Sequence, residues 1–364
     1  MLIDVVAGAR PNFMKISPII KALKRKGRSN KNISYRLVHT GQHYDQKMSS
    51  AFFEQLNIPK PDINLEVRSG TQAEQTSAIM LNYEALLQKG KPDLCLVVGD
   101  VNSTMACAIV AQKQGVSVAH IEAGLRSNDW SMPEEINRLV TDSISNLFFT
   151  TSSSASENLL KSGVEREKIF FVGNTMIDTL LENLGSLKVP SFWNQKSLMS
   201  GNYFVLTLHR PANVDKVENL TDALREIVRA ARGLPIIFPV HPRTSNVLKE
   251  TNDLPKNLVF VPPQPYLEFI YLVKNSKAVV TDSGGITEET TVLGIPCMTL
   301  RTNTERPETV TLGTNELLGT DPMFIKPAFD KLFSNQWKTG CVPPKWDGQA
   351  SERIVEVLLG LSKV

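Results

Sequence analysis

The chain reads Ala278-Val279-Val280-Thr281-Asp282-Ser283-Gly284-Gly285-Ile286-Thr287-Glu288-Glu289. The apolar run at the start predicts a buried strand, and the small residues after it predict a turn into a helix. The N–H groups at such a helix start have no partner within the helix, and together with the helix dipole they attract phosphate. An ordinary strand-to-helix turn explains Ser-Gly-Gly alone equally well. The acid Glu289 and the later run Thr304-Glu305-Arg306-Pro307-Glu308 favour a nucleotide site, with a carboxylate for a ribose and an Arg nearby.

The same alternation of short apolar runs and helical patterns extends over the chain. Strands that are apolar on both faces and separated by helices are typical of parallel sheets with helices on both sides. We therefore predict an α/β protein with two Rossmann-like, doubly wound domains. The predicted strands cover residues 2–6, 35–38, 94–98, 116–121, 147–149, 169–172, 203–208, 235–240, 258–261 and 278–280. The predicted helices cover residues 14–26, 71–89, 102–114, 133–146, 217–232, 266–274, 283–293 and 351–361, with one more through Met48, Phe52 and Leu56.

A length of 364 residues favours two domains over one. Periodicity weakens between residues 182 and 201, a segment that contains Pro190, Trp193 and Gly201, and this predicts the passage into the second domain. We expect an N-terminal domain at 1–185 with the candidate acids and a C-terminal domain at 186–350 with the phosphate-binding turn. A final helix within 351–364 is expected to pack back on the N-terminal domain, although either half could receive it.

Composition narrows the class of protein. The net charge is +3, from 40 basic and 37 acidic residues, and no strongly basic run stands out, so nucleic acid is not an expected partner. Four scattered Cys residues show no metal-site spacing and fit a reducing cytoplasm, with Cys95, Cys107 and Cys297 as core residues. We expect no signal peptide, no membrane span and no metal.

Polar residues follow several of the predicted strands. Ligand crevices in doubly wound sheets lie at the carboxyl ends of the strands. Asp100, Glu122 and, on the next helix, Glu134 could move protons if they converge on an apolar crevice that raises their pKa values. The alternatives are a helix cap for Asp100, a rim charge for Glu122 and an i,i+4 pair with Arg138 for Glu134. In the second half, His209 is either a capping group or a partner of phosphate.

The turn after the first strand excludes two nucleotide motifs. It contains the single glycine Gly8, and the chain has neither G-x-G-x-x-G nor a P-loop, so a nicotinamide cofactor is not expected. Arg10 in this turn is either a simple turn residue or a bidentate phosphate ligand. With carboxylates in one half and the phosphate turn in the other, we expect a cleft between the domains.

The ordered set of motifs resembles the non-hydrolysing UDP-N-acetylglucosamine 2-epimerases over residues 1 to about 320. The shared residues are Gly8-Ala9-Arg10-Pro11, Lys15, Gly99-Asp100, Glu122-Ala123-Gly124-Leu125-Arg126, Pro133-Glu134-Glu135, Arg138, Gly173-Asn174-Thr175, Asp178, His209-Arg210, Thr281 to Glu289 and Thr304 to Glu308. The resemblance implies the GT-B architecture, a homodimer and no cofactor. It also implies inversion at carbon 2 to give UDP-N-acetylmannosamine, by elimination of UDP to 2-acetamidoglucal and its re-addition, usually for cell-surface polysaccharide.

The resemblance also implies roles for single positions. The implied catalytic residues are Asp100, Glu122, Glu134 and His209. The implied contacts to the UDP-N-acetylhexosamine substrate are Arg10, Lys15, Arg138, Gln264, Phe269, Ser283, Gly284, Gly285, Glu289 and Arg306, with Glu289 on the ribose and Phe269 near the uracil. Gln42, His43 and Arg210 match part of a second, activating nucleotide-sugar site.

Three positions depart from the family pattern. Asn12 stands where many relatives carry Glu, and Pro211-Ala212-Asn213 stands where Glu-Asn or Glu-Ser is commoner. Tyr44 replaces the Arg of relatives with the activating site, which puts that site in doubt.

Rival functions stay open from the sequence. One is a 2-epimerase of a modified UDP-sugar such as a UDP-diacetamido-uronate, and another is a GT-B glycosyltransferase. A hydrolysing epimerase and a UDP-sugar-binding regulator without turnover complete the alternatives.

Overall fold

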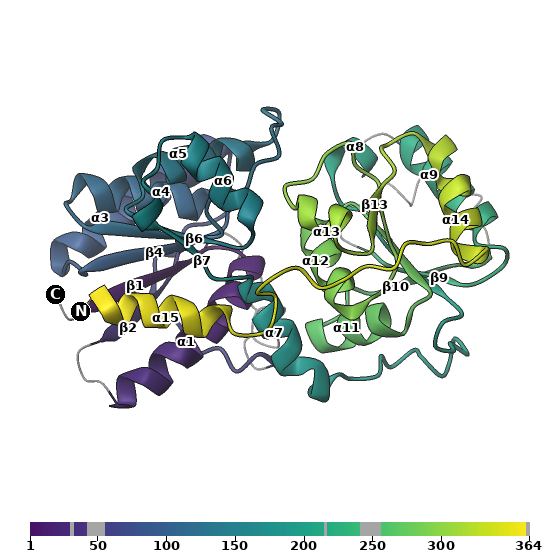
Figure 1. Cartoon of the computed structure of the whole chain (residues 1–364), viewed down its shortest axis with the longest axis horizontal. Helices are drawn as coiled ribbons and strands as arrows, with labels where there is room; N and C mark the ends of the chain where they lie inside the picture. Colours follow the sequence, from purple (N-terminus) through teal and green to yellow (C-terminus); the bar gives the residue numbers. More distant parts are fainter. Residues whose placement is uncertain (30–32, 42–54, 215–216, 241–255, 362–364) are drawn as a thin grey trace. The chain divides into compact units, whose positions relative to one another are not determined.

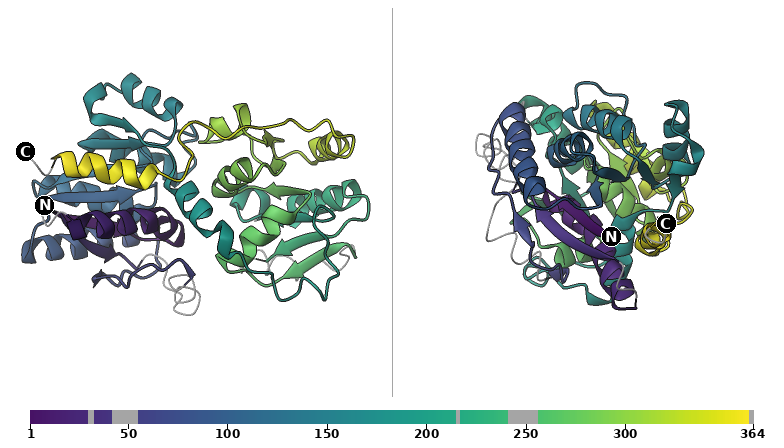
Figure 2. Two further views of the ribbon diagram at one scale, coloured as in Figure 1. Left: turned by 60° about the horizontal axis from the view of Figure 1, so that its bottom comes forward. Right: turned by 90° about the vertical axis from the view of Figure 1, so that its left-hand side faces the viewer.

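The computed structural model describes residues 1–29, 33–41, 55–214, 217–240 and 256–361. The chain divides into two compact units, which we describe separately. Unit 1 comprises Met1–Glu182 and Pro344–Val364, and unit 2 comprises Asn183–Pro343. The end of the chain thus returns to unit 1, where helix α15 (Ala350–Leu361) packs against α1 (Arg10–Ser29). Figures 1 and 2 show these two helices side by side.

Unit 1 contains a seven-stranded parallel sheet in the order β3-β2-β1-β4-β5-β6-β7. Strand β4 is wholly apolar and buried, and β5 is buried except at Ser117, as expected for central strands covered on both faces. The strands are β1 (Leu2–Ala7), β2 (Ser34–His39), β3 (Ile63–Asn64), β4 (Leu94–Val98), β5 (Ser117–Ile121), β6 (Leu147–Thr150) and β7 (Ile169–Phe171). The remaining helices are α3 (Gln72–Lys89), α4 (Asn102–Lys113), α5 (Pro133–Ile144), α6 (Ser153–Lys161) and α7 (Thr175–Asn183), which crosses the unit boundary.

Unit 2 contains a six-stranded parallel sheet in the order β10-β9-β8-β11-β12-β13. Separate clusters of buried apolar side chains lie around this sheet, one of them with Phe204, Phe238 and Phe329 and another with Tyr203 and Val279. The strands are β8 (Phe204–Thr207), β9 (Ile236–Pro239), β10 (Leu258–Val261), β11 (Ala278–Thr281), β12 (Cys297–Thr299) and β13 (Asn315–Leu317). The helices are α8 (Pro211–Val214), α9 (Val217–Ala230), α11 (Tyr266–Asn275), α12 (Gly284–Leu293), α13 (Pro307–Thr311) and α14 (Ile325–Phe333).

Each sheet has one point where the strand order reverses. In unit 1 the reversal lies between β1 and β4, and in unit 2 it lies between β8 and β11. The connections on the two sides of such a point run in opposite directions, which opens a crevice at the carboxyl ends of the two strands. Gly99 and Asp100 follow β4, while His209 and Asp282 follow β8 and β11. The topology therefore brings the predicted motifs to the two places where a doubly wound sheet binds ligands.

Several elements differ from the sequence prediction. Helix α1 begins at Arg10 rather than Met14, because a proline such as Pro11 is well tolerated in the first helical turn. Helices α6, α7, α13 and α14 and the short strands β3 and β13 were not predicted. In α6 the Ser-rich start resembles a loop, but the Ser152 side chain accepts a hydrogen bond from the N–H of Ala155 at 3.3 Å and caps the helix. Most of the helix predicted through Met48 and Phe52 lies outside the described residues.

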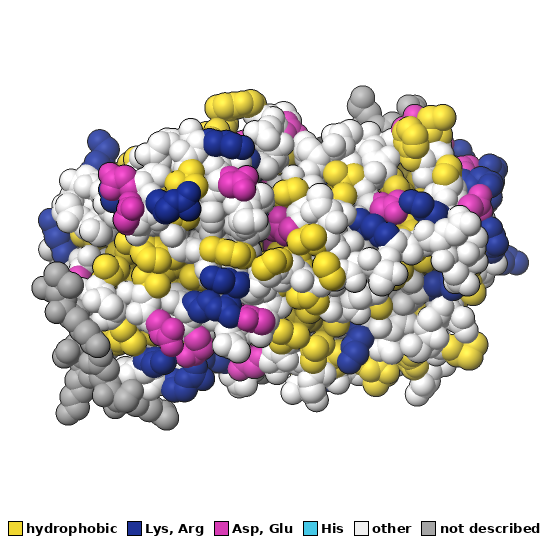
Figure 3. All heavy atoms as spheres, in the orientation of Figure 1, with side chains coloured by type: hydrophobic (Ala, Val, Ile, Leu, Met, Phe, Trp, Pro, Cys, Tyr) yellow, Lys and Arg dark blue, Asp and Glu magenta, His cyan; other side chains and the backbone are white. Residues whose placement is uncertain are grey.

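Charged side chains of both signs are interspersed on the face shown in Figure 3, without a broad single-sign area. Cys95, Cys107 and Cys297 are buried free thiols, as predicted, and Cys341 is exposed. None of the described helices combines the length and apolar character that a bilayer crossing needs. Within the same residues, no group of three or more His, Cys, Asp and Glu side chains is arranged to hold a metal ion.

Candidate active site

In unit 1, Lys15 and Glu122 meet at the reversal point. The Lys15 Nζ atom lies 2.5 Å from Oε2 of Glu122, and both side chains are buried. A Cβ placed on Gly99 would lie 3.4 Å from that Nζ atom and 3.5 Å from that Oε2 atom, so the pair sits directly against the turn after β4. Glu122 itself has a φ of 66°, a conformation that non-glycine residues seldom adopt. The turn after β5 therefore directs the Glu122 carboxylate toward the turn that carries Asp100.

Asn12, one of the departures from the family pattern, supports this arrangement from α1. Its Oδ1 atom accepts hydrogen bonds from the N–H groups of Gly8 and Ala9, and its Nδ2 atom donates to the Val98 carbonyl at 3.1 Å. A carboxylate at this position would lose the donated bond. Asn12 thus ties the end of β1 and the start of α1 to the end of β4.

Asp100 is held by the buried guanidinium of Arg138 on α5. Two nitrogens of Arg138, Nε and Nη2, donate to Oδ2 of Asp100 at 3.0 and 2.8 Å, and Nη1 also pairs with Glu135. Helix α4 has Val101 as its N-cap residue, so the capping role considered for Asp100 is wrong. Arg138, considered as the partner of Glu134, forms these ion pairs with Asp100 and Glu135.

The surroundings of the acids differ from the predicted apolar crevice. Glu122 is buried rather than a rim charge, and it faces the ammonium of Lys15. Asp100 faces a guanidinium. Each of these two carboxylates therefore has a charged neighbour, and a nearby cation favours the ionised form of a carboxylate. Glu134 occupies the first turn of α5, half-buried.

In unit 2, His209 and Asp282 form a pair at the reversal point. The Nδ1 atom of His209 lies 3.0 Å from Oδ1 of Asp282, and the carboxylate also accepts the N–H of Arg210 at 2.9 Å and Nδ2 of Asn213 at 3.0 Å. Burial alone would raise the pKa of Asp282, but the hydrogen bonds from His209 and Asn213 outweigh it and lower the pKa. The ionised carboxylate can only accept, so Nδ1 carries the proton of this hydrogen bond, and Nε2 lies on the other side of the ring.

Helix α12 starts beside this pair, at the turn predicted to bind phosphate. Ser283 is the N-cap residue, but its side chain makes no capping hydrogen bond. A Cβ on Gly284 would lie 2.6 Å from Oε1 of Glu305, so a side chain at that position would require the Glu305 carboxylate to shift. Glu305 pairs with Arg301 at 2.8 Å, and the buried Arg306 pairs with Glu288. The first amides of α12 and the Ser283 hydroxyl are therefore available donors for an anion.

Glu289 lies one turn further into α12 and is almost fully buried. Burial raises its pKa to about 8, and the nearby Glu288 adds to this effect while Tyr266 opposes it. At neutral pH this carboxyl is largely protonated, so it can donate as well as accept a hydrogen bond. That is a suitable group for a ribose hydroxyl.

The other predicted residues of unit 2 lie on or beside α11 and α8. Phe269 is half-buried on α11 and packs against the apolar cluster around Tyr203, and Gln264 precedes the helix and donates to the Pro262 carbonyl at 2.6 Å. Nε of Arg210 donates to the Asp282 carbonyl at 2.9 Å.

Three further predicted residues belong to unit 1. Arg10 is the first residue of α1, and Gln42 and His43 lie outside the described residues. The roles assigned to all these positions stay predictions.

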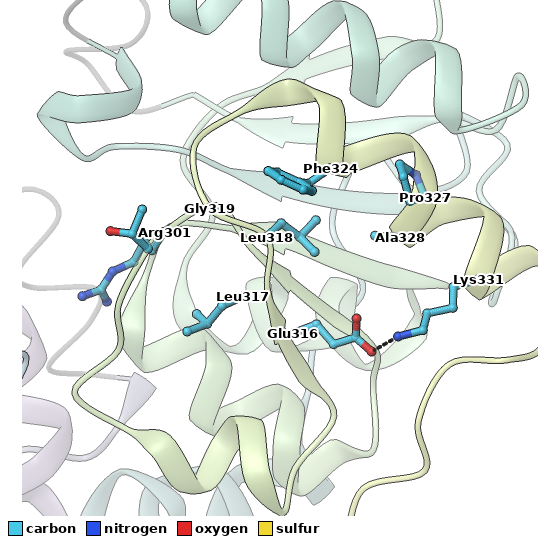
Figure 4. Close-up of a pocket in the computed structure, with 10 residues that line it drawn as sticks. Arg301, Glu316, Leu317, Leu318, Gly319, Phe324, Pro327, Ala328 and Lys331 are labelled. Atoms are coloured by element: carbon cyan, nitrogen blue, oxygen red, sulfur yellow. Dashed lines mark hydrogen bonds and ion pairs between the residues drawn. The ribbon is translucent and has the colours of Figure 1, made fainter.

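A hollow of about 570 Å³ in unit 2 lies elsewhere (Figure 4). Leu318, Phe324 and Ala328 line it, and the ion pair between Glu316 and Lys331 lies at its side. No residue predicted for the site belongs to its described lining.

Sequence reasoning missed Asp282 and Asn12 as site residues. Asp282 stood inside the quoted stretch without a role. The signal in the sequence was an acid that follows one strand and a histidine, His209, that follows another. Only the pairing of β8 with β11 shows that the two residues are adjacent. Asn12 carried no signal beyond being a departure from the family pattern.

Comparisons with known proteins show close relatives over the whole chain. The family model described as UDP-N-acetylglucosamine 2-epimerase matches residues 25–359. A Methanocaldococcus jannaschii UDP-N-acetylglucosamine 2-epimerase is 43% identical, with 98% of this chain and 99% of the relative covered. A Pseudomonas aeruginosa UDP-2,3-diacetamido-2,3-dideoxy-D-glucuronate 2-epimerase is 40% identical, with 99% of this chain and 100% of the relative covered. The M. jannaschii crystal structure in complex with UDP-GlcNAc and UDP has a TM-score of 0.89 and 41% identity, and covers 99% of this chain and 100% of that one.

Proposed function

The chain belongs to the UDP-N-acetylglucosamine 2-epimerase family, with its GT-B fold, and we propose that it converts UDP-N-acetylglucosamine into UDP-N-acetylmannosamine. The observation that carries the proposal is the placement of ionisable groups at both reversal points, each held by a charged partner. Glu122 has Lys15, Asp100 has Arg138, and the imidazole of His209 has Asp282. Such groups can move protons from a defined position.

The proposed reaction begins with removal of the proton on carbon 2 of the sugar. The electron pair of that C–H bond forms the double bond between carbons 1 and 2, and the bond from carbon 1 to the UDP oxygen breaks, with its electron pair leaving on UDP. The product is 2-acetamidoglucal. Re-addition of the UDP oxygen to carbon 1 and delivery of a proton to the opposite face of carbon 2 complete the inversion.

Asp100, Glu122, Glu134 and His209 are the proposed proton-transfer groups. The ion pairs hold the Glu122 and Asp100 carboxyl groups in defined positions. The Asp282 carboxylate keeps the acceptor nitrogen of His209 on the side away from it, and the ring is 46% exposed and accessible to a ligand.

The start of α12 is proposed to hold the diphosphate while the sugar is detached. Ser283, Gly284 and Gly285 supply donors, Glu289 binds the ribose, and Phe269 and Gln264 contact the uracil. Arg10, Lys15, Arg138 and Arg306 are proposed as further cationic groups of the substrate site. UDP must stay bound while it is separated from the sugar, because its release would prevent its re-addition to 2-acetamidoglucal.

The test is solvent exchange at carbon 2. The purified protein is incubated with UDP-N-acetylglucosamine in heavy water, and the sugars are analysed by NMR and mass spectrometry. We expect one deuterium at carbon 2 and formation of UDP-N-acetylmannosamine without free N-acetylmannosamine. Absence of both exchange and product with this and related UDP-sugars would contradict the proposal, and sugar transfer without exchange would indicate a glycosyltransferase.

A second substrate is favoured by one observation. The 40% identical P. aeruginosa relative acts, by its name, on UDP-2,3-diacetamido-2,3-dideoxy-D-glucuronate. The chemistry at carbon 2 is the same for this sugar, so the same assay with both sugars at equal concentration decides between them. We propose UDP-N-acetylglucosamine as the substrate with the higher kcat/KM.

We also propose that the protein acts as a cytoplasmic homodimer in the supply of precursors for cell-surface polysaccharide. Buried reduced thiols at Cys95, Cys107 and Cys297 support a reducing compartment. Light scattering during size-exclusion chromatography tests the dimer, for which a mass twice that of one chain is expected.

A further inference from the structure

His120 is a fully buried histidine on β5 that the proposed reaction does not use. Both of its ring nitrogens face oxygen atoms. Nδ1 lies 2.7 Å from Oδ1 of Asp142 on α5, and Nε2 lies 2.8 Å from the carbonyl oxygen of Gly99, the residue before Asp100. The imidazole thus bridges helix α5 and the turn after β4.

The partners of the ring determine its protonation state. A carbonyl oxygen can only accept, so Nε2 must carry a proton. Oδ2 of Asp142 accepts the N–H of Gly124 at 3.1 Å and a guanidinium nitrogen of Arg126 at 2.5 Å, which makes Asp142 an ionised acceptor. A hydrogen bond from Nδ1 to that carboxylate needs a proton on Nδ1 as well, so the two contacts together favour two ring protons.

The charges around the ring agree with this state. Burial would raise the pKa of Asp142, but His120 and Arg126 together outweigh it and lower the pKa. The neighbouring turns carry the pairs of Lys15 with Glu122 and of Arg138 with Asp100 and Glu135. With His120 protonated, the four cations Lys15, His120, Arg126 and Arg138 match the four carboxylates Glu122, Asp142, Asp100 and Glu135.

The bridge fixes both turns that carry the proposed acids. Gly99 donates its N–H to the Ile121 carbonyl at 3.0 Å and accepts from His120 through its own carbonyl, so both of its polar groups are tied to β5. On the other turn, Asp142 accepts the N–H of Gly124, and Nδ2 of Asn158 donates to the carbonyl of the same residue at 2.9 Å. The Glu122 backbone, at its positive φ, is held between these anchors.

We propose that His120 and Asp142 form a buried imidazolium–carboxylate clamp that sets the position of Asp100 relative to Glu122. The part of this proposal that concerns catalysis rests on the proposed function. His120 and Asp142 are positioning residues, because they act through the two turns and touch neither substrate nor reacting atoms. A misplacement of about 1 Å caused by a change away from the chemistry can cost about 100-fold in rate.

The first experiment measures the protonation state without any assay of turnover. Selective ¹⁵N-histidine labelling and NMR at pH 7.5 report the protons on each ring, with His120 assigned by the signal lost in His120→Gln. We expect two ring protons in the wild type and one in Asp142→Asn, because the amide nitrogen of Asn donates to Nδ1 and removes the need for its proton. A single ring proton in the wild type would overturn the imidazolium.

The second experiment measures positioning. The kcat for deuterium incorporation at carbon 2 should fall by up to about 100-fold in His120→Gln and in Asp142→Asn, while the Kd for UDP stays unchanged. The matched control is Thr141→Val, which removes a buried hydroxyl bound to the Asn137 carbonyl on the same helix without touching the clamp. The double variant His120→Gln/Asp142→Asn should recover about tenfold over His120→Gln, because a Gln oxygen then faces an amide donor instead of a carboxylate.

The outcomes separate the clamp from the proposed function. Unchanged kcat in both single variants, or an equal loss in Thr141→Val, would overturn the positioning role. If the wild type shows no exchange with any UDP-sugar, the proposed function fails, and hydrogen exchange of the Gly99 and Gly124 amides then decides the clamp. Faster exchange of both amides in Asp142→Asn supports it, and unchanged exchange overturns it.

Discussion

The environment of each side chain in the site depends on its partners more than on its own residue type. Glu122 and Asp100 resemble ordinary surface acids in sequence, yet one is buried against Lys15 and the other is held by two nitrogens of Arg138. Ser283 resembles an ordinary N-cap, yet its hydroxyl makes no capping bond. These departures from the default use of each residue type are the strongest structural signs of function at this scale.

Substitution of Ser283 should affect UDP binding, whereas substitution of Glu122 should affect proton transfer. Ser283→Ala removes one donor to the diphosphate and should weaken UDP binding by about 1.5–3 kcal/mol. Glu122→Gln should leave the Kd for UDP unchanged and slow deuterium incorporation by about 10²- to 10⁴-fold. Calorimetry and the exchange assay measure the two effects, with the exposed Glu157→Gln on α6 as the control. If both variants only weakened binding, this division of roles would be wrong.

Asp282→Asn should impair His209 without removing it. The amide cannot accept all the hydrogen bonds that the carboxylate accepts, and its nitrogen would favour the ring tautomer with the proton on Nε2. We expect kcat to fall by about 10²- to 10⁴-fold. Asp321→Asn, an exposed cap in the same unit, is the control and should keep full activity. Activity within twofold of the wild type would exclude a role for the pair.

Glu289 should make stability depend on pH. Its folded pKa of about 8 lies above the ordinary value of 4.5, so between these values the folded state holds a proton that the unfolded chain has released. Stability therefore falls as pH rises through this window, by at most about 1.4 kcal/mol per pH unit, and the effect levels off above pH 8. In Glu289→Gln this contribution is absent. Urea unfolding of nucleotide-free protein at pH 5, 6, 7 and 8 should show a shallower decline in the variant, and parallel curves would contradict the assignment.

At the scale of elements, the junctions between strands and helices place the chemistry. The end of β5 enters a left-handed turn at Glu122, and the end of β11 enters α12 directly. Other junctions hold the fold together. Asp178 on α7 accepts the N–H groups of Ala350 at 3.1 Å and Ser351 at 2.7 Å, and so caps α15 from a helix distant in sequence.

Asp178→Ala should detach the start of α15. The variant loses two hydrogen bonds at a helix N-terminus, so we expect a loss of about 1–2 kcal/mol in the free energy of unfolding. Hydrogen exchange should increase first in α15 and in the surface of α1 beneath it. Glu356→Ala, an exposed carboxylate on the same helix, is the control and should change stability by less than about 0.5 kcal/mol. Equal effects of the two variants would argue against the cap.

At the scale of the whole molecule, each unit has its own sheet and apolar core, and the chain passes between the units twice. The returning segment is anchored in unit 1 by Trp346, which is buried and donates from its indole nitrogen to the Thr151 carbonyl at 3.0 Å. Gly173 permits the close approach of this segment, since a Cβ there would lie 2.0 Å from the Lys345 carbonyl oxygen.

Trp346→Ala should destabilise unit 1 selectively. Loss of a buried indole typically costs about 3–5 kcal/mol. Hydrogen exchange should therefore increase across the unit 1 sheet, whereas β8 to β13 should keep their protection. Trp130→Ala provides the control, because that side chain is 72% exposed and its removal should be nearly neutral. Uniform loss of protection in both units would show that they unfold as one.

Local pattern in the sequence was sufficient for the fold class and for most central elements. Apolar runs and periodicity are local properties of the sequence. They were enough to predict the buried strands β4 and β11 and the helices α3 and α11. Short or unusually capped elements such as β3, β13 and α6 were not predicted, because their formation depends on neighbours supplied by the fold. The motifs also led to the family, which the comparisons confirmed.

The partners of the site residues were decided only by the tertiary structure. Lys15 and Glu122 are 107 positions apart, and His209 and Asp282 are 73 apart, so no local pattern could pair them. The charged partners of the acids could not be predicted for the same reason: a carboxylate's environment consists of side chains from other strands and helices. The sequence determined which groups stand at the strand ends, and the order of strands in each sheet decided which charges face one another.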